Sequence, residues 1–87
     1  MTERLAEAKK EFEKAIELDK NYVAPRLQLG YCICKMGMQS MSPSMMNDAD
    51  AVLEETIRLF PDCPDAWSLH GQVSYYFIFL YFCTLRN

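Results

Sequence analysis

The sequence repeats itself at a fixed offset of 41 residues, and this feature restricts the possible folds more than any other. Five residues recur unchanged at that offset, and they include small, acidic and large apolar ones. A chain of 87 residues has room for one small domain, so the repeat indicates a stack of similar units. The recurring pairs are Ala8 and Ala49, Glu13 and Glu54, Ile16 and Ile57, Leu18 and Leu59, and Gly30 and Gly71.

Apolar residues recur at three- and four-residue steps, which predicts helices separated by turns. The expected helices cover residues 2–18, 25–37, 47–60 and 64–73. Gly37 is the expected stop of the second helix, and Asn47 or Asp48 is the expected N-cap of the third. The uncharged stretch 36–47 between them is expected to be a long loop. The predicted fold class is all-α, with about four antiparallel helices in helix-turn-helix pairs.

The recurring positions are similar to the signature of the tetratricopeptide repeat (TPR), a helix pair of about 34 residues. The matching segments are Leu29-Gly30 and Trp67-x2-His70-Gly71 on first helices, and Ala8-x3-Phe12 and Ala49-x3-Leu53 on second helices. The resemblance implies a fragment of a solenoid. The period of 41 residues is seven longer than the standard repeat, and these extra residues are expected within residues 36–47. Gly30 and Gly71 are then expected where neighbouring helices approach closely, with Tyr31 and Trp67 filling the space between them.

A second resemblance lies in the run Ile57-x2-Phe60-Pro61-x-Cys63-x5-Leu69-x2-Gln72. It resembles a repeat junction of the large TPR receptor of the mitochondrial outer-membrane translocase (TOM complex), which accepts precursors carrying internal targeting signals. The resemblance covers roughly residues 5–72 and implies a fragment of a protein-transport scaffold that binds precursor polypeptides. The parent protein would sit at the cytosolic face of the mitochondrial outer membrane, held by an anchor outside this sequence. The fragment alone is expected in the cytosol.

The TPR resemblance also implies a concave groove lined by the first helix of each repeat. Leu27 and Tyr31 stand where chaperone-binding repeats place side chains that grip a terminal carboxylate, and neither can neutralise one. An apolar peptide, extended or helical, is therefore the expected ligand, and the open alternative is that another helix covers this face. The candidate groove residues are Leu27, Tyr31, Cys34, Lys35, Ser68 and Gln72, with Ala24 and Asp65 in the same register.

The residue types argue against an enzyme, a cofactor, a metal site or a nucleic-acid partner. The net charge of −3 comes without a basic stripe. The single histidine, His70, is expected in the core or the groove rather than as a general base. Cys32 and Cys34 are two residues apart on a helix, so they point to different sides and cannot hold one ion. The methionines between 36 and 46 could form an adaptable surface or a copper(I) site, but a mobile loop is the simpler expectation.

Residues 73–87 form an apolar, aromatic tail without charge until Arg86 and without a visible helical period. One hypothesis is that the repeats occupy 1–72 and the tail is translated intron, because Gln-Val-Ser can be encoded by an exon end followed by a splice donor. The alternative is a selected hydrophobic capping helix. A third interpretation is a TPR-type adaptor or co-chaperone module, which the tail could tether to a membrane. The tether, but not the module itself, conflicts with the length of the tail. The 13 residues from Val73 to Leu85 fall short of the about 20 that a bilayer requires.

Overall fold

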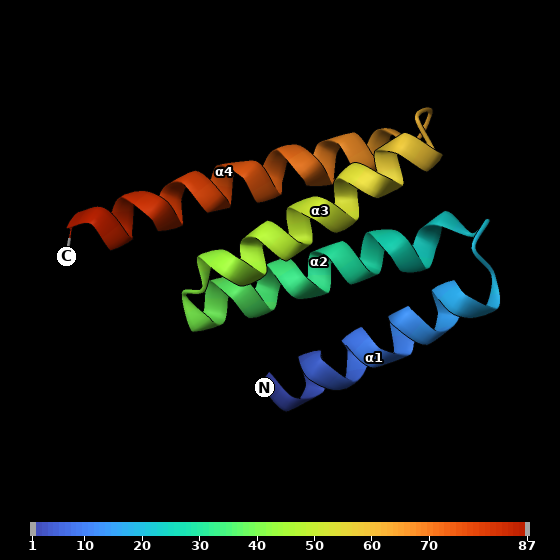
Figure 1. Ribbon diagram of the computed structural model, residues 1–87, viewed down its shortest axis with the longest axis horizontal. Coiled ribbons are helices and arrows are strands. Elements are labelled where there is room, and N and C mark those ends of the chain that lie inside the picture. Colours follow the sequence, from blue (N-terminus) through green and yellow to red (C-terminus); the bar gives the residue numbers. More distant parts are fainter. Residues whose placement is uncertain (1, 87) are drawn as a thin grey trace.

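The described residues, 2–86, fold into four α-helices and contain no strand. In this computed structural model the helices are α1 (Thr2–Leu18), α2 (Val23–Ser40), α3 (Pro43–Leu59) and α4 (Pro64–Arg86) (Figure 1). The predicted all-α class is confirmed. Met1 and Asn87, which belong to the predicted segments 1–72 and 73–87, lie outside the described residues.

Consecutive helices run antiparallel and are stacked in chain order from α1 to α4 (Figure 1). Each helix packs against the next one in the sequence, and α2 also contacts α4. In the described part of the chain, α1 and α3 share no such contact. Alternate helices therefore contact each other on only one side of the stack, the side formed by α2 and α4.

The connection between α2 and α3 consists of Met41 and Ser42, so the predicted long loop over 36–47 is wrong. Met41 adopts a left-handed backbone conformation with φ 53° and ψ 46°. The backbone N–H of Ser42 donates to the carbonyl of Gly37 at 2.9 Å, and that of Met41 donates to the carbonyl of Met38 at 3.4 Å. This pattern is a Schellman C-cap, which reverses the chain in a minimal number of residues.

Helix α3 begins directly after this turn. The Oγ of Ser42 accepts a hydrogen bond from the backbone N–H of Met45 at 3.3 Å, and Pro43 occupies the first helical position. A serine N-cap followed by proline is a favourable helix start, because the cap pairs a free N–H and proline has none to pair. The N-cap predicted at Asn47 or Asp48 is therefore wrong, since both residues lie inside α3.

The core lies between α2 and α3 and extends to α4. Met46 is completely buried, and Met38 and Met45 pack against the core, so these methionines belong to the core rather than to a mobile loop. Gly37 does not stop α2, and it lets the two helices approach: a Cβ at this position would lie 2.8 Å from the sulfur of Met46. The buried core cluster comprises Leu29, Ile33, Cys34, Met46, Ala49, Leu53, Val73 and Leu80.

The apolar tail continues α4 without a break. Val73 and Leu80 are completely buried, and Tyr76 and Phe77 pack against the same core. The tail therefore has one buried face, although its composition shows no helical period. Within the described residues, no helix combines the length and the apolar character needed to cross a bilayer.

Two TPR-signature positions on α4 have surroundings that differ from the expectation. The side chain of Trp67 is 55% exposed, and its indole N–H donates to the carbonyl of Pro61 at 3.0 Å. A Cβ on Gly71 would meet no atom within 4 Å. Gly30, by contrast, approaches its neighbour closely, because a Cβ there would lie 2.7 Å from a methyl carbon of Leu53. The expected close approach is confirmed at Gly30 and wrong at Gly71.

Candidate functional site

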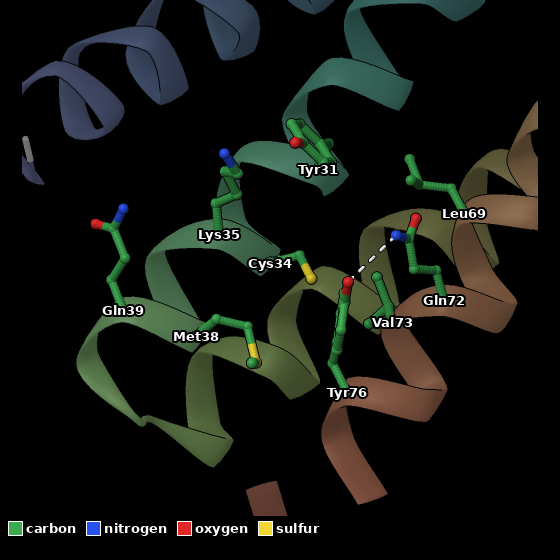
Figure 2. Close-up of a pocket in the computed structure, with 9 residues that line it drawn as sticks. All are labelled: Tyr31, Cys34, Lys35, Met38, Gln39, Leu69, Gln72, Val73 and Tyr76. Carbon is green, nitrogen blue, oxygen red and sulfur yellow. Dashed lines mark hydrogen bonds between the residues drawn. The ribbon is translucent and has the colours of Figure 1, made fainter. Parts of the chain in front are cut away.

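A groove runs between α2 and α4, on the side of the stack where these two helices meet. It consists of two adjoining hollows of about 250 and 380 Å³, which share Tyr31, Leu69 and Gln72. Figure 2 shows the first hollow, with side chains from α2 on one side and side chains from α4 on the other. We refer to both hollows together as the α2/α4 groove.

All six predicted groove residues line the α2/α4 groove, although their role in binding stays a prediction. The helical register places them together, because residues three and four apart lie on one face of a helix. Cys34 and Lys35 line the first hollow, Leu27 and Ser68 line the second, and Tyr31 and Gln72 line both. Asp65 also lines the second hollow, whereas Ala24 lines neither.

The two hollows differ in charge. Among the described residues that line the groove, Lys35 is the one cation, and its Nζ lies 5.5 Å from the centre of the Tyr31 ring. This distance permits a cation–π interaction. Asp65, which belongs to the second hollow, is the one anionic residue in the part of the lining that the structure describes. A bound polypeptide would therefore meet a positive charge in one hollow and a negative charge in the other.

Hydrogen-bonding groups accompany the apolar walls. The side-chain amide of Gln72 donates to the hydroxyl of Tyr76 at 3.4 Å, as the dashed line in Figure 2 shows. The glutamine amide has two N–H donors and a carbonyl oxygen with two lone pairs, and the tyrosine hydroxyl both donates and accepts hydrogen bonds. Both groups therefore keep hydrogen-bonding positions free for a ligand. Such groups can pair with the backbone of a peptide while its apolar side chains enter the hollows.

The thiol of Cys34 faces the groove but is a poor nucleophile. Burial raises the pKa of Cys34 above its ordinary value, so the thiol stays protonated at neutral pH. Cys32 lies on another side of α2, where its Sγ donates to the carbonyl of Leu5 in α1 at 3.1 Å. Burial also raises the pKa of Cys32, and the charge of Lys9 partly offsets this. The prediction that the two cysteines point to different sides is confirmed.

Several groove residues were not predicted from the sequence. Met38 and Gln39 continue the helical step of Tyr31, Cys34 and Lys35 but fall within residues 36–47, which were expected to be a loop. Gln28 lies on α2 next to Leu27, and the other three residues lie on α4, two of them in the tail. Extending the helical period beyond residues 35 and 72 would have found most of them. The groove residues that were not predicted are Gln28, Met38, Gln39, Leu69, Val73 and Tyr76.

His70 lies on the other side of α4, away from the groove. It is half-buried, and its Nε2 is 2.8 Å from the carboxylate of Asp50 in α3. The prediction that His70 occupies the core or the groove is wrong. It lies at the edge of the contact between α3 and α4, facing the acidic side chains of Asp50 and Glu54.

Comparison with known proteins assigns no family to the chain. No protein-family model, no curated protein and no solved structure matches it. A function must therefore be argued from the α2/α4 groove, from the order of the helices and from the sequence pattern.

Proposed function

We propose that the chain is a protein-interaction scaffold that binds a polypeptide segment in the α2/α4 groove. One observation carries this proposal: six residues chosen by repeat register, from positions 27–35 and 68–72, line a single groove. A second observation supports it. Contact between α2 and α4, without contact between α1 and α3 in the described residues, is the arrangement of a curved stack with one concave side.

The lining of the groove favours an apolar peptide, helical or extended. Leu27 and Leu69 supply aliphatic surface, and Tyr31 and Tyr76 supply aromatic rings with polar tips. A ligand with several carboxylates would meet a single cation among the described groove residues, Lys35, and would lose the hydration of its other charges without compensation. The negative charge of Asp65 in the second hollow disfavours acidic ligands further.

In its finer form, the proposal is that the chain is a TPR segment of a mitochondrial import receptor and that its ligands are precursor polypeptides. The resemblance of residues 57–72 to a repeat junction of that receptor supports this form. An apolar groove suits hydrophobic internal targeting signals, because such segments expose apolar side chains before they reach a membrane. The parent protein would act at the cytosolic face of the mitochondrial outer membrane.

Fluorescence anisotropy with two labelled peptides tests the proposal. One peptide is an apolar segment of a precursor that carries internal targeting signals, and the other is an acidic peptide that ends in a free carboxylate. We expect the apolar peptide to bind more tightly. Tyr31→Ala should weaken its binding about tenfold, which corresponds to about 1.4 kcal/mol, because an aromatic residue at the centre of a groove is a typical hot spot.

Tyr81→Ala provides a matched control. It makes the same chemical change on α4, but Tyr81 is 55% exposed and lies outside the groove. We expect it to leave peptide binding unchanged. Equal weakening by both substitutions, or tighter binding of the acidic peptide, would refute the groove as the binding site. Loss of helicity in Tyr31→Ala, measured by circular dichroism, would show that Tyr31 is a core residue instead.

A further inference from the structure

Three potential metal ligands converge where α3 meets α4, apart from the α2/α4 groove. Asp50 and Glu54 lie one turn apart on α3, and His70 faces them from α4. One ligand atom from each residue, a carboxylate oxygen or an imidazole nitrogen, lies within 4.8 Å of the other two. None of the three residues lines the groove. We refer to them as the acid–histidine cluster.

The central pair of this cluster has unsatisfied polar atoms. The Nε2 of His70 and the Oδ1 of Asp50 are 2.8 Å apart, yet neither atom has a hydrogen-bond partner with acceptable geometry. Both atoms are buried, although the side chains as a whole are 27% and 30% exposed. A buried nitrogen and a buried oxygen without partners are costly. At 2.8 Å the lone pairs of a neutral imidazole nitrogen and a carboxylate oxygen repel each other, unless a proton on the nitrogen or a cation bound to both atoms stabilises the contact.

The spacing of the ligand atoms suits a small tetrahedral ion. Zinc binds imidazole nitrogen and carboxylate oxygen at about 2.0–2.2 Å, which places neighbouring ligand atoms roughly 3.4 Å apart. The Nε2 of His70 lies 2.8 Å from Asp50 and 3.8 Å from the Oε1 of Glu54, so the observed distances bracket that value. Small side-chain rotations would equalise them. Two carboxylates with one neutral imidazole also balance the charge of a divalent ion.

The surroundings can supply the fourth ligand and a route of entry. Glu54 is 65% exposed, so one side of the cluster opens to solvent. On the other side, Asp50 lines a hollow of about 210 Å³ together with Asn47 and Ser74. A water molecule from either side could complete the coordination. Imidazole favours zinc over magnesium or calcium, which prefer an all-oxygen shell.

We propose that Asp50, Glu54 and His70 bind a zinc ion that ties α4 to α3. The bound ion would join two helices of neighbouring repeats and would bridge the two close polar atoms at their contact. It would act as a structural ion, because it binds the folded arrangement and not the separated helices. The competing explanation is a protonated His70 that forms a simple ion pair with Asp50, without any metal.

Isothermal titration of the metal-free full chain with zinc chloride tests the proposal, with magnesium chloride as the comparison ion. We expect saturable binding of one zinc ion per chain, a higher midpoint of thermal unfolding in zinc, and no effect of magnesium. His70→Gln and Glu54→Gln should each weaken zinc binding by about tenfold or more, because even indirect partners of a metal ligand contribute about 10–100-fold. Glu54 is exposed, so its variant keeps the fold if His70→Gln does not.

Two controls make the outcome specific. Glu55→Gln removes a neighbouring carboxylate of α3 that pairs with Arg58, outside the cluster, and should leave zinc binding unchanged. Joint replacement of Cys63 and Cys83 by serine removes the two half-buried thiols and should also leave it unchanged. Each of three results would overturn the proposal. They are a lack of saturable zinc binding, full zinc affinity in both His70→Gln and Glu54→Gln, and a loss of zinc binding when the two cysteines are replaced.

Discussion

The two glycines at equivalent repeat positions, Gly30 and Gly71, should respond in opposite directions to substitution by alanine. A Cβ at Gly30 would lie 2.7 Å from one methyl carbon of Leu53 and 2.8 Å from its Cγ. Leu53 is completely buried and cannot move aside without disturbing the core. A Cβ at Gly71 would meet no atom within 4 Å. The same chemical change therefore creates a clash at one site and none at the other.

The size of each effect follows from two opposing contributions. Alanine is favoured over glycine inside a helix by about 1 kcal/mol, so Gly71→Ala should raise the free energy of unfolding by about that amount. At Gly30 the same gain applies, but overpacking of a filled core costs about 1–3 kcal/mol. We expect Gly30→Ala to lower the free energy of unfolding by about 1 kcal/mol. The two variants should then differ by about 2 kcal/mol.

Urea unfolding followed by far-ultraviolet circular dichroism measures both effects. The titrations should be repeated at several protein concentrations, so that association is separated from unfolding. Gly30→Ala should unfold at lower urea, and Gly71→Ala at higher urea, than the unsubstituted chain. If Gly30→Ala proves as stable as Gly71→Ala, the close approach of α2 and α3 at Leu53 is wrong.

Three further predictions concern the turn and the tail. Met41→Gly should stabilise the chain by about 1 kcal/mol in the same urea assay, because Met41 holds a left-handed conformation that disfavours side chains. Leu80→Ala should cost about 2–5 kcal/mol of stability because Leu80 is fully buried, whereas Ile78→Ala, at 57% exposure, should change little. Phe79 and Phe82 are exposed apolar side chains, so we expect them to promote self-association and expect their joint replacement by lysine to reduce it in sedimentation velocity. Unchanged association would exclude this surface as its cause.

Parts of the fold could be predicted because residues 2–18 separate their apolar and charged residues clearly and because a proline marks the end of α3. Helix α1 follows from apolar steps on a charged background, and Phe12 and Ile16 from that stripe pack against the core. The end of α3 follows from Pro61, which cannot continue a helix. In such segments the local pattern and the tertiary contacts favour the same structure.

The turn between α2 and α3 differs from the predicted loop over 36–47. The uncharged composition of this stretch favours a loop, whereas a helix-start signal within it indicates the true position of the turn. Ser42 followed by Pro43 is a favourable helix start, but both lie in an uncharged, methionine-rich stretch that looks like a loop. Only the three-dimensional packing shows that Met46 fills the core and that Gly37 makes room for it. Tertiary contacts of this kind cannot be read from a neighbourhood of ten residues.

The candidate groove was easier to predict than the acid–histidine cluster. Groove positions follow from a helical step, which is a property of each helix alone. The cluster needs Asp50 and His70 to meet across two helices, and that depends on how far α4 is shifted along α3. In sequence, Asp50 and Glu54 are indistinguishable from the exposed acids of any amphipathic helix.

Helix α4 shows why an apolar segment can hide its own periodicity. Its buried residues, Ala66, Val73 and Leu80, recur every seven positions, with Leu69 and Tyr76 packed between them. The opposite face is also apolar, because Tyr75, Ile78, Phe79, Phe82 and Leu85 are all more than half exposed. A period becomes visible in a sequence only when the exposed face is polar, so the tail shows none. Because the buried face alone holds α4 against α3, polar substitutions on the exposed face should leave the helix stack intact. They should also remove an exposed apolar surface that favours association.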